Sequence, residues 1–240
     1  MTPISNPLRW LWLLPFAAAA LPLLATLLAY VLSIRLELAP ACNPLFDGCV
    51  SISRAARHGL PNILFRALLL PAAVLQILCW LLFPLWLRSL DATAPTRWMA
   101  ALPWLGTFAG ICLILYGSFL GTDGEGYRLM RRYGVAFYFG FTCIGMLVVS
   151  GEVQRLVRAE RHHRWVGNAL LGLCLALPLL GLLHVFVPLA LPGEATRNAL
   201  QNITEWWGGV IFTLFFFVLA WAWWRSGAEL LLRLQRPTGR

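Results

Sequence analysis

Six long uncharged stretches set the main constraint on how this chain can fold. They cover residues 10–34, 67–87, 98–122, 133–151, 165–193 and 206–224, and the shortest has 19 residues. A helix of about 19 to 20 apolar residues crosses the roughly 30 Å hydrocarbon core of a bilayer. Barrel strands are much shorter, and irregular backbone cannot face lipid because its polar groups would lack partners. The sequence therefore predicts an all-α, polytopic membrane protein with six transmembrane helices in a single domain, 1–240.

The predicted helix boundaries follow these stretches with one exception. Pro61 suits the first turn of a helix and residues 63–65 are already apolar, so the second helix is expected to span 61–87. This start places Arg66 inside the helix, about 8 Å along its axis. The first stretch is longer than a signal-peptide core and no convincing cleavage site follows it, so we expect it to be retained as a helix.

The positive charge of the chain fits a membrane better than a nucleic acid. The formal net charge is +9, and every cation is an arginine, most of them near the ends of the apolar stretches. Arginines in these positions set topology and meet lipid headgroups, whereas a nucleic-acid surface needs one basic stripe. We therefore expect membrane lipids as partners and no nucleic acid, and leave open a protein partner in the membrane.

The distribution of arginines predicts the orientation of the chain. If the N-terminus is inside, the cytoplasmic segments hold 11 arginines and the outer segments hold 7. This excess favours an N-in, C-in topology. The exclusive use of arginine as the cation is typical of GC-rich bacterial genomes, so the bacterial inner membrane is the expected location.

Two of the six cysteines lie in the first polar loop. Cys42 and Cys49 are separated by residues that permit a tight loop, and an outer loop is exposed to an oxidising compartment, so we predict a disulfide between them. The other four cysteines lie within apolar stretches, where they act as small buried side chains. The histidines are too dispersed to converge on a metal or haem, and no cofactor is expected.

Polar residues gather before the second, fourth and sixth helices, all of which enter the membrane from the predicted outer side. Helix N-termini carry partial positive charge, and neighbouring arginines add full charges, so an anionic phosphate could be held there. The predicted lipid-binding residues are Arg54, Arg66, Arg131, Arg132 and Glu205. Alternatively, these residues solvate the loops and bind lipid nonspecifically.

Polar side chains at membrane depth have two interpretations each. Arg66 either extends to the headgroups or pairs with Glu205, in which case the second and sixth helices are neighbours. Gln76, Tyr116 and His184 either line a cavity or join helices by hydrogen bonds, which is the more common use of such residues.

The first loop also has a catalytic interpretation. Ser51, Ser53 and His58, with Asp47, supply the residue types of a serine hydrolase. However, a Ser-x-Ser sequence before a helix is ordinary turn chemistry, and no Gly-x-Ser-x-Gly elbow surrounds it.

Three segments together resemble the DRAM/Frag family, whose members include GPI-lipid-remodelling and autophagy-associated membrane proteins. The first is Ser51-Ile52-Ser53, followed by Pro61 and Phe65-Arg66; the others are Arg132 to Phe139 and Thr204-Glu205-Trp206. The resemblance implies a six-helix layout and lipid handling at the outer leaflet, and marks Ser51, Ser53, Pro61, Arg66 and Glu205. This chain departs from the family by having Arg131 and Arg132 where members often carry a histidine before the fourth helix.

The sequence thus leads to one principal hypothesis and two alternatives. The principal hypothesis is a non-enzymatic membrane protein that binds or redistributes an anionic, phospholipid-like lipid at the outer leaflet. The first alternative is a lipid-modifying hydrolase or acyltransferase that uses Ser51 or Ser53. The second alternative is a structural subunit of a membrane complex.

Overall fold

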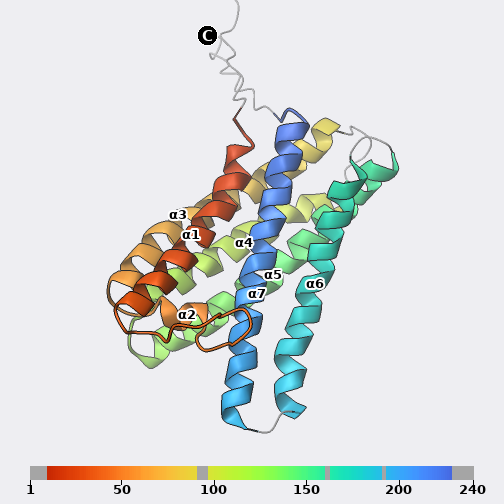
Figure 1. Cartoon of the computed structure of the whole chain (residues 1–240). Helices are drawn as coiled ribbons and strands as arrows, with labels where there is room; N and C mark the ends of the chain where they lie inside the picture. Colours follow the sequence, from red (N-terminus) through yellow and green to blue (C-terminus); the bar gives the residue numbers. More distant parts are fainter. Residues whose placement is uncertain (1–9, 91–96, 160–162, 191–192, 229–240) are drawn as a thin grey trace, which may run out of the picture.

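The computed structural model describes residues 10–90, 97–159, 163–190 and 193–228, and this part of the chain is all α. It contains seven helices, six of which are long and apolar enough to cross a membrane. The exception is the four-residue α2. In chain order the helices are α1 Leu13–Arg35, α2 Ile52–Ala55, α3 Gly59–Leu90, α4 Arg97–Phe119, α5 Glu125–Arg158, α6 Arg164–Ala190 and α7 Glu194–Arg225 (Figure 1).

Two helices extend well beyond the uncharged stretches that predicted them. α5 begins at Glu125 instead of residue 133 and ends at Arg158, and α7 begins at Glu194 instead of 206. The uncharged stretch marks the part of a helix that fits hydrocarbon, whereas Arg and Glu are good helix formers that continue the helix into the headgroup region. Both helices start after a glycine with positive φ, Gly124 and Gly193, which allows the chain to turn sharply.

The remaining boundaries differ less from the prediction. α3 begins at Gly59, so Pro61 lies in the first turn as expected. α1 begins at Leu13, α4 ends at Phe119, and α6 ends at Ala190. The end predicted for this fifth stretch, at residue 193, falls beyond positions 191–192, which lie outside the described residues.

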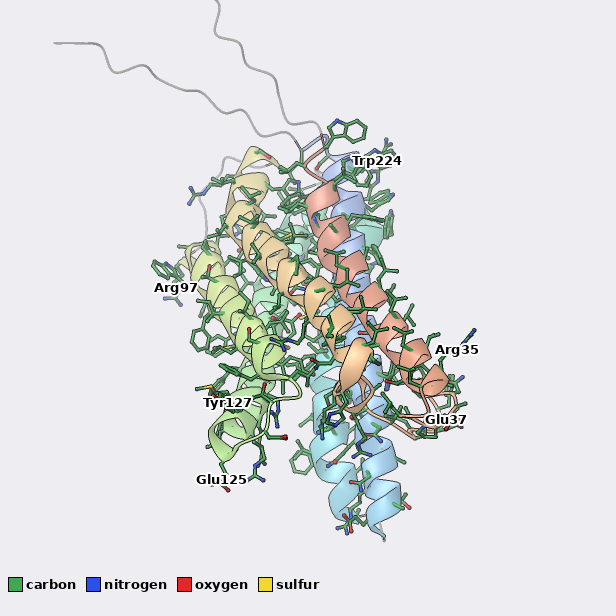
Figure 2. All side chains as sticks on the ribbon, turned by 90° about the vertical axis from the view of Figure 1, so that its left-hand side faces the viewer. Arg35, Glu37, Arg97, Glu125, Tyr127 and Trp224 are labelled. Atoms are coloured by element: carbon green, nitrogen blue, oxygen red, sulfur yellow. A yellow bond between two sulfur atoms is a disulfide. The ribbon has the colours of Figure 1, made fainter. Side chains whose placement is uncertain are left out.

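The six long helices form a closed ring. Each packs against the next in chain order from α1 through α3, α4, α5 and α6 to α7, and α7 packs back against α1. The start of α1 and the end of α7 therefore lie at the same end of the bundle (Figure 1). Figure 2 shows Trp224 at this end and Glu125 toward the other. We call the other end the α2 end, because it carries α2 and the loop 36–51.

An even number of spans places both ends of the described chain at the same end of the bundle. The assignment of this end to the cytoplasm stays a prediction. Part of the arginine count that predicts N-in, C-in topology falls outside the described residues. These arginines are Arg9, Arg161, Arg233, Arg236 and Arg240.

The half of the ring away from the α2 end is filled by aromatic side chains. Trp80 and Phe83 of α3 meet Phe216 and Trp223 of α7, with ring centroids 6.0 Å apart for Trp80–Phe216 and 5.6 Å for Phe83–Trp223. A Cβ at Gly106 of α4 would lie 2.0 Å from the Trp80 side chain, so only glycine lets α4 approach this closely. This half of the bundle is therefore a closed core.

The helices separate toward the α2 end. The start of α6 packs against the end of α5. There Gln154 donates a hydrogen bond to Asn168, and a Cβ on Gly167 would lie 3.0 Å from the Val157 side chain. Farther along, residues 181–186 of α6 are all exposed. Figure 1 shows the α6–α7 hairpin extending past the other helices at this end. The ring is consequently wider here, with a cavity inside it.

Candidate functional site

A cavity of about 100 Å³ lies inside the ring, in the half nearer the α2 end. One buried water needs roughly 10–15 Å³, so the cavity has room for several waters or a short hydrocarbon segment. Its walls come from five of the six long helices and from α2, and they are mostly apolar. The apolar wall residues include Pro22, Ile52, Phe65, Leu69, Leu113, Val135, Phe139, Gly209, Phe212 and Phe216.

The deeper end of the cavity has a satisfied polar floor. Tyr138 of α5 donates its hydroxyl to Gln76 Oε1 at 3.0 Å, and Gln76 Nε2 donates to the carbonyl of Ala18 in α1 at 3.3 Å. All three groups are buried. Gln76 thus joins α1, α3 and α5 by hydrogen bonds at the side of the cavity nearer the aromatic core.

Glu205 of α7 is the acidic group of the cavity wall and lies near the α2 end. Its Oε1 accepts a hydrogen bond from the backbone N–H of Ser53 at 3.0 Å, and the Ser53 hydroxyl also interacts with the carboxylate. The charges of Arg57 and Arg54 act on Glu205 as well. Because Ser53 lies in the first turn of α2, one of the free N–H groups at the start of this helix is satisfied by the carboxylate.

Tyr116 of α4 adds a second polar group near Glu205. Its side chain lines the cavity and is 8% exposed, yet within the described chain its hydroxyl has no hydrogen-bond partner. The charges of Glu205, Arg57 and Arg131 all act on this hydroxyl. The polar part of the cavity therefore contains a carboxylate and a hydroxyl with unused hydrogen-bonding capacity.

The loop 36–51 holds α2 in place. The predicted disulfide between Cys42 and Cys49 is confirmed, and Tyr30 of α1 donates its hydroxyl to the Cys42 carbonyl at 2.6 Å. From α7, Trp206 Nε1 donates to the Val50 carbonyl at 2.9 Å and Asn202 Nδ2 donates to the Gly48 carbonyl at 2.7 Å. These contacts fix the position of Ser51, which caps α2 by accepting from the Arg54 N–H at 3.2 Å.

Gly48 shows how closely the loop lies on α7. Its φ is +62°, and a Cβ there would lie 2.1 Å from the Ala199 carbonyl oxygen. Any larger residue would push the loop off the helix.

The predicted ion pair between Arg66 and Glu205 is wrong. Arg66 lies in a shallow groove on the outside of α3, with Ile63, Ala67, Leu70 and Pro71, and is half-buried. Successive helical residues are turned by about 100°, so Phe65 faces the cavity and Arg66 turns away from it. In addition, α1 packs between α3 and α7 in the ring. The lipid-binding role of Arg66 stays a prediction, separate from Glu205.

The other predicted arginines have different surroundings. Arg131 donates to the carbonyls of Phe119, at 3.0 Å, and Thr122, so it caps the C-terminus of α4. Arg132 and Arg54 are exposed. Asn62, which sequence reasoning did not single out, fixes the same corner by donating to the Leu120 carbonyl at 3.0 Å and the Ala56 carbonyl at 2.9 Å.

The candidate catalytic residues are only partly brought together. The hydroxyls of Ser51 and Ser53 are 3.2 Å apart, but no hydrogen bond joins the exposed His58 to either serine in the described structure. The acidic residue next to Ser53 is Glu205 and not Asp47, which accepts from the backbone N–H of Asn43 at 2.8 Å.

The polar residues at membrane depth take both of the roles considered from sequence. Gln76 joins helices and also lines the cavity, whereas Tyr116 lines the cavity without a partner. His184 joins helices, with its Nδ1 2.6 Å from the Thr204 hydroxyl. Tyr138 was missed, because apolar periodicity does not distinguish it from its neighbours. Arg57 belongs to the polar residues before the second helix, but it was not among the predicted lipid-binding residues.

Comparison with protein-family models, with curated proteins and with solved structures found no match to this chain.

Proposed function

We propose that this chain is a non-enzymatic membrane protein that binds a phospholipid-like lipid through its anionic phosphate at the α2 end of the bundle, in the outer leaflet. The cavity that holds Glu205 carries the proposal, because it combines apolar walls with one carboxylate that lies near the exposed Arg54 and Arg57. A phospholipid likewise has an apolar acyl chain and a charged headgroup at one end. Redistribution of lipid between sites in the membrane is the process that such binding would serve.

The surface at the α2 end can receive a phosphate. Arg54 and Arg57 are exposed, and neither forms an ion pair within the described residues. Arginine presents several N–H donors in a planar fork that matches phosphate oxygens. Arg54 lies in α2 and Arg57 lies just after it. The contacts of the loop 36–51 and the hydrogen bond to Glu205 hold α2 against α7.

The apolar walls can receive the start of an acyl chain. Phe65, Phe139 and Phe212 enter the cavity from three different helices. When a hydrocarbon covers the apolar surface that faces a cavity, the free energy of the system falls. The outside of the bundle is also strongly apolar, with Trp104 80% exposed and Leu179 59% exposed, as expected for a surface in contact with lipid.

A cavity-filling substitution tests this proposal. Gly209 lines the cavity, and a Cβ there meets the Ile52 side chain at an acceptable 3.4 Å, so Gly209→Phe should fill the space without unfolding the ring. Gly140→Phe is the matched control, because Gly140 is exposed and has nothing within 4 Å of its Cβ position. The protein would be purified in mild detergent and its retained phospholipid measured by native mass spectrometry.

The proposal expects retained phospholipid in the unaltered protein and in Gly140→Phe, and its loss in Gly209→Phe. An unaltered protein without lipid, or equal retention in both variants, would contradict it.

A lipid-modifying enzyme is the second candidate function, and one contact favours it. The Ser53 hydroxyl interacts with the Glu205 carboxylate, and a carboxylate next to a hydroxyl can act as its general base. Incubation of the protein with defined phospholipids, followed by lipid mass spectrometry, distinguishes the two functions. Conversion of lipid that is abolished by Ser53→Ala would establish the enzyme, and unchanged lipid would exclude it for the lipids used.

A further inference from the structure

The carboxylate of Glu205 has no cationic partner in direct contact within the described residues. Its Oε1 accepts from Ser53, and the printed ion pairs of this part of the chain join other residues, Arg128 to Glu125 and Arg155 to Glu152. An ionised carboxylate offers about four acceptor positions on two oxygens. Glu205 lines the cavity, so acceptor positions remain for a ligand there.

The hydroxyl of Tyr116 lies in the same cavity wall and is also unused. Tyr116 as a residue is 8% exposed, and its hydroxyl has no hydrogen-bond partner in the described chain. A polar group in an apolar site is stabilised when a ligand or a water forms the missing hydrogen bond. Tyr116 and Glu205 line the same cavity, so one ligand can reach both.

The charges around this neighbourhood have a definite arrangement. Glu205 supplies negative charge at the cavity wall, while Arg54 and Arg57 supply exposed positive charge close enough to act on it. A ligand that matches both must carry a cation or strong donors beside an anion. A purely anionic headgroup would satisfy the arginines and leave Glu205 and Tyr116 without partners.

We infer that the site selects phospholipids whose headgroup carries a primary ammonium next to the phosphate, as in an ethanolamine phospholipid. The inference rests on the proposed function and specifies its ligand. The ammonium donates to the Glu205 carboxylate and to the Tyr116 hydroxyl oxygen, and the phosphate lies at Arg54 and Arg57. A choline headgroup has the charge but no N–H donors, and a glycerol headgroup has hydroxyl donors but no positive charge.

Native mass spectrometry of the full chain in detergent can test this selection. The protein is titrated separately with dioleoyl phosphatidylethanolamine, phosphatidylcholine and phosphatidylglycerol. We expect the ethanolamine lipid to bind about tenfold more tightly than either of the others, as one charge-assisted hydrogen bond would provide. Equal affinity for the three lipids would overturn the inference, whereas failure of all three to bind would overturn the proposed function itself.

Variants locate the source of the selection. Glu205→Gln keeps an acceptor for the Ser53 N–H and removes the charge, so we expect lipid binding to persist and the preference for ethanolamine to vanish. Glu125→Gln is the matched control, because Glu125 is exposed, pairs with Arg128 within the described part of the chain and lies outside the cavity. A preference that survives Glu205→Gln would overturn the inference.

Tyr116→Phe provides an independent measurement if Glu205→Gln fails to fold. It removes only the hydroxyl and keeps the ring that packs in the wall. We expect it to weaken binding of the ethanolamine lipid several-fold and to leave binding of the choline lipid unchanged. An equal effect on both lipids would overturn the inference.

Discussion

The carboxylate of Glu205 accepts a hydrogen bond from the backbone N–H of Ser53 at 3.0 Å across 152 positions of the chain. This contact joins α7 to the first turn of α2 and places the wall of the cavity beside exposed arginines. The same hydrogen bond supports the loop 36–51, which four further side chains also hold in place: Tyr30, Asn202, Trp206 and Trp207. Stability at the α2 end and the geometry of the cavity therefore depend on common residues.

Removal of the Glu205 side chain should destabilise the α2 end. Glu205→Ala leaves the partly buried Ser53 N–H without its acceptor, at a cost of about 1–3 kcal/mol in the free energy of unfolding. Thermal unfolding in detergent measures the effect. Glu125→Ala, at an exposed position, should change the free energy of unfolding by no more than about 0.5 kcal/mol. Equal effects of the two substitutions would contradict the structural role of Glu205.

Substitutions of Arg66 and Glu205 should act independently. The two side chains face different surroundings, so the effects of Arg66→Ala and Glu205→Ala on the free energy of unfolding should add within about 0.5 kcal/mol in the double variant. A double-mutant cycle in detergent measures this. A larger coupling free energy would mean that the residues interact after all.

Loss of the disulfide should loosen the loop that carries α2. In the chain-entropy model, the short loop closed by Cys42 and Cys49 contributes about 2 kcal/mol, and the double replacement by serine should lower the free energy of unfolding accordingly. A reductant should bring the unaltered protein to the stability of the variant and leave the variant unchanged. If thiol labelling finds both cysteines free before reduction, the bridge is absent.

The orientation of the bundle can be measured with introduced cysteines. Ser89 lies near the end of α3, and Asp123 lies in the turn between α4 and α5. Both residues are exposed, and they are at opposite ends of the bundle. With N-in, C-in topology, a membrane-impermeant maleimide should label Asp123→Cys in intact cells and Ser89→Cys only after permeabilisation. The reverse pattern would place the α2 end in the cytoplasm.

The all-α class, the six long helices and the disulfide were predictable because each has a local signal. Uncharged stretches of sufficient length identify helices in lipid, and two cysteines close in sequence identify a bridge. The ends of α5 and α7 were not predictable from the same signal, because Glu125 and Glu194 begin helical turns beyond the apolar part.

The site was predictable only in part because its geometry depends on helix rotation and on long-range contacts. Glu205 lines the cavity, but its hydrogen-bond partner is Ser53 and not Arg66, since Arg66 is rotated away from the cavity that Phe65 faces. The charge of Glu205 and its expected depth in the membrane could not tell a Ser53 partner from an Arg66 partner. The unpartnered hydroxyl of Tyr116 likewise becomes visible only when the surrounding helices are placed.

The most direct measurement of the central claim, that lipid occupies the cavity, is photocrosslinking. Membranes containing the protein would be supplied with a phospholipid that carries a photoactivatable group on the first part of its acyl chain, and adducts would be mapped by mass spectrometry. The account predicts adducts on cavity residues such as Phe65, Phe139 and Phe212, and their loss in Gly209→Phe. Adducts confined to lipid-facing residues such as Trp104 and Leu179 would contradict it.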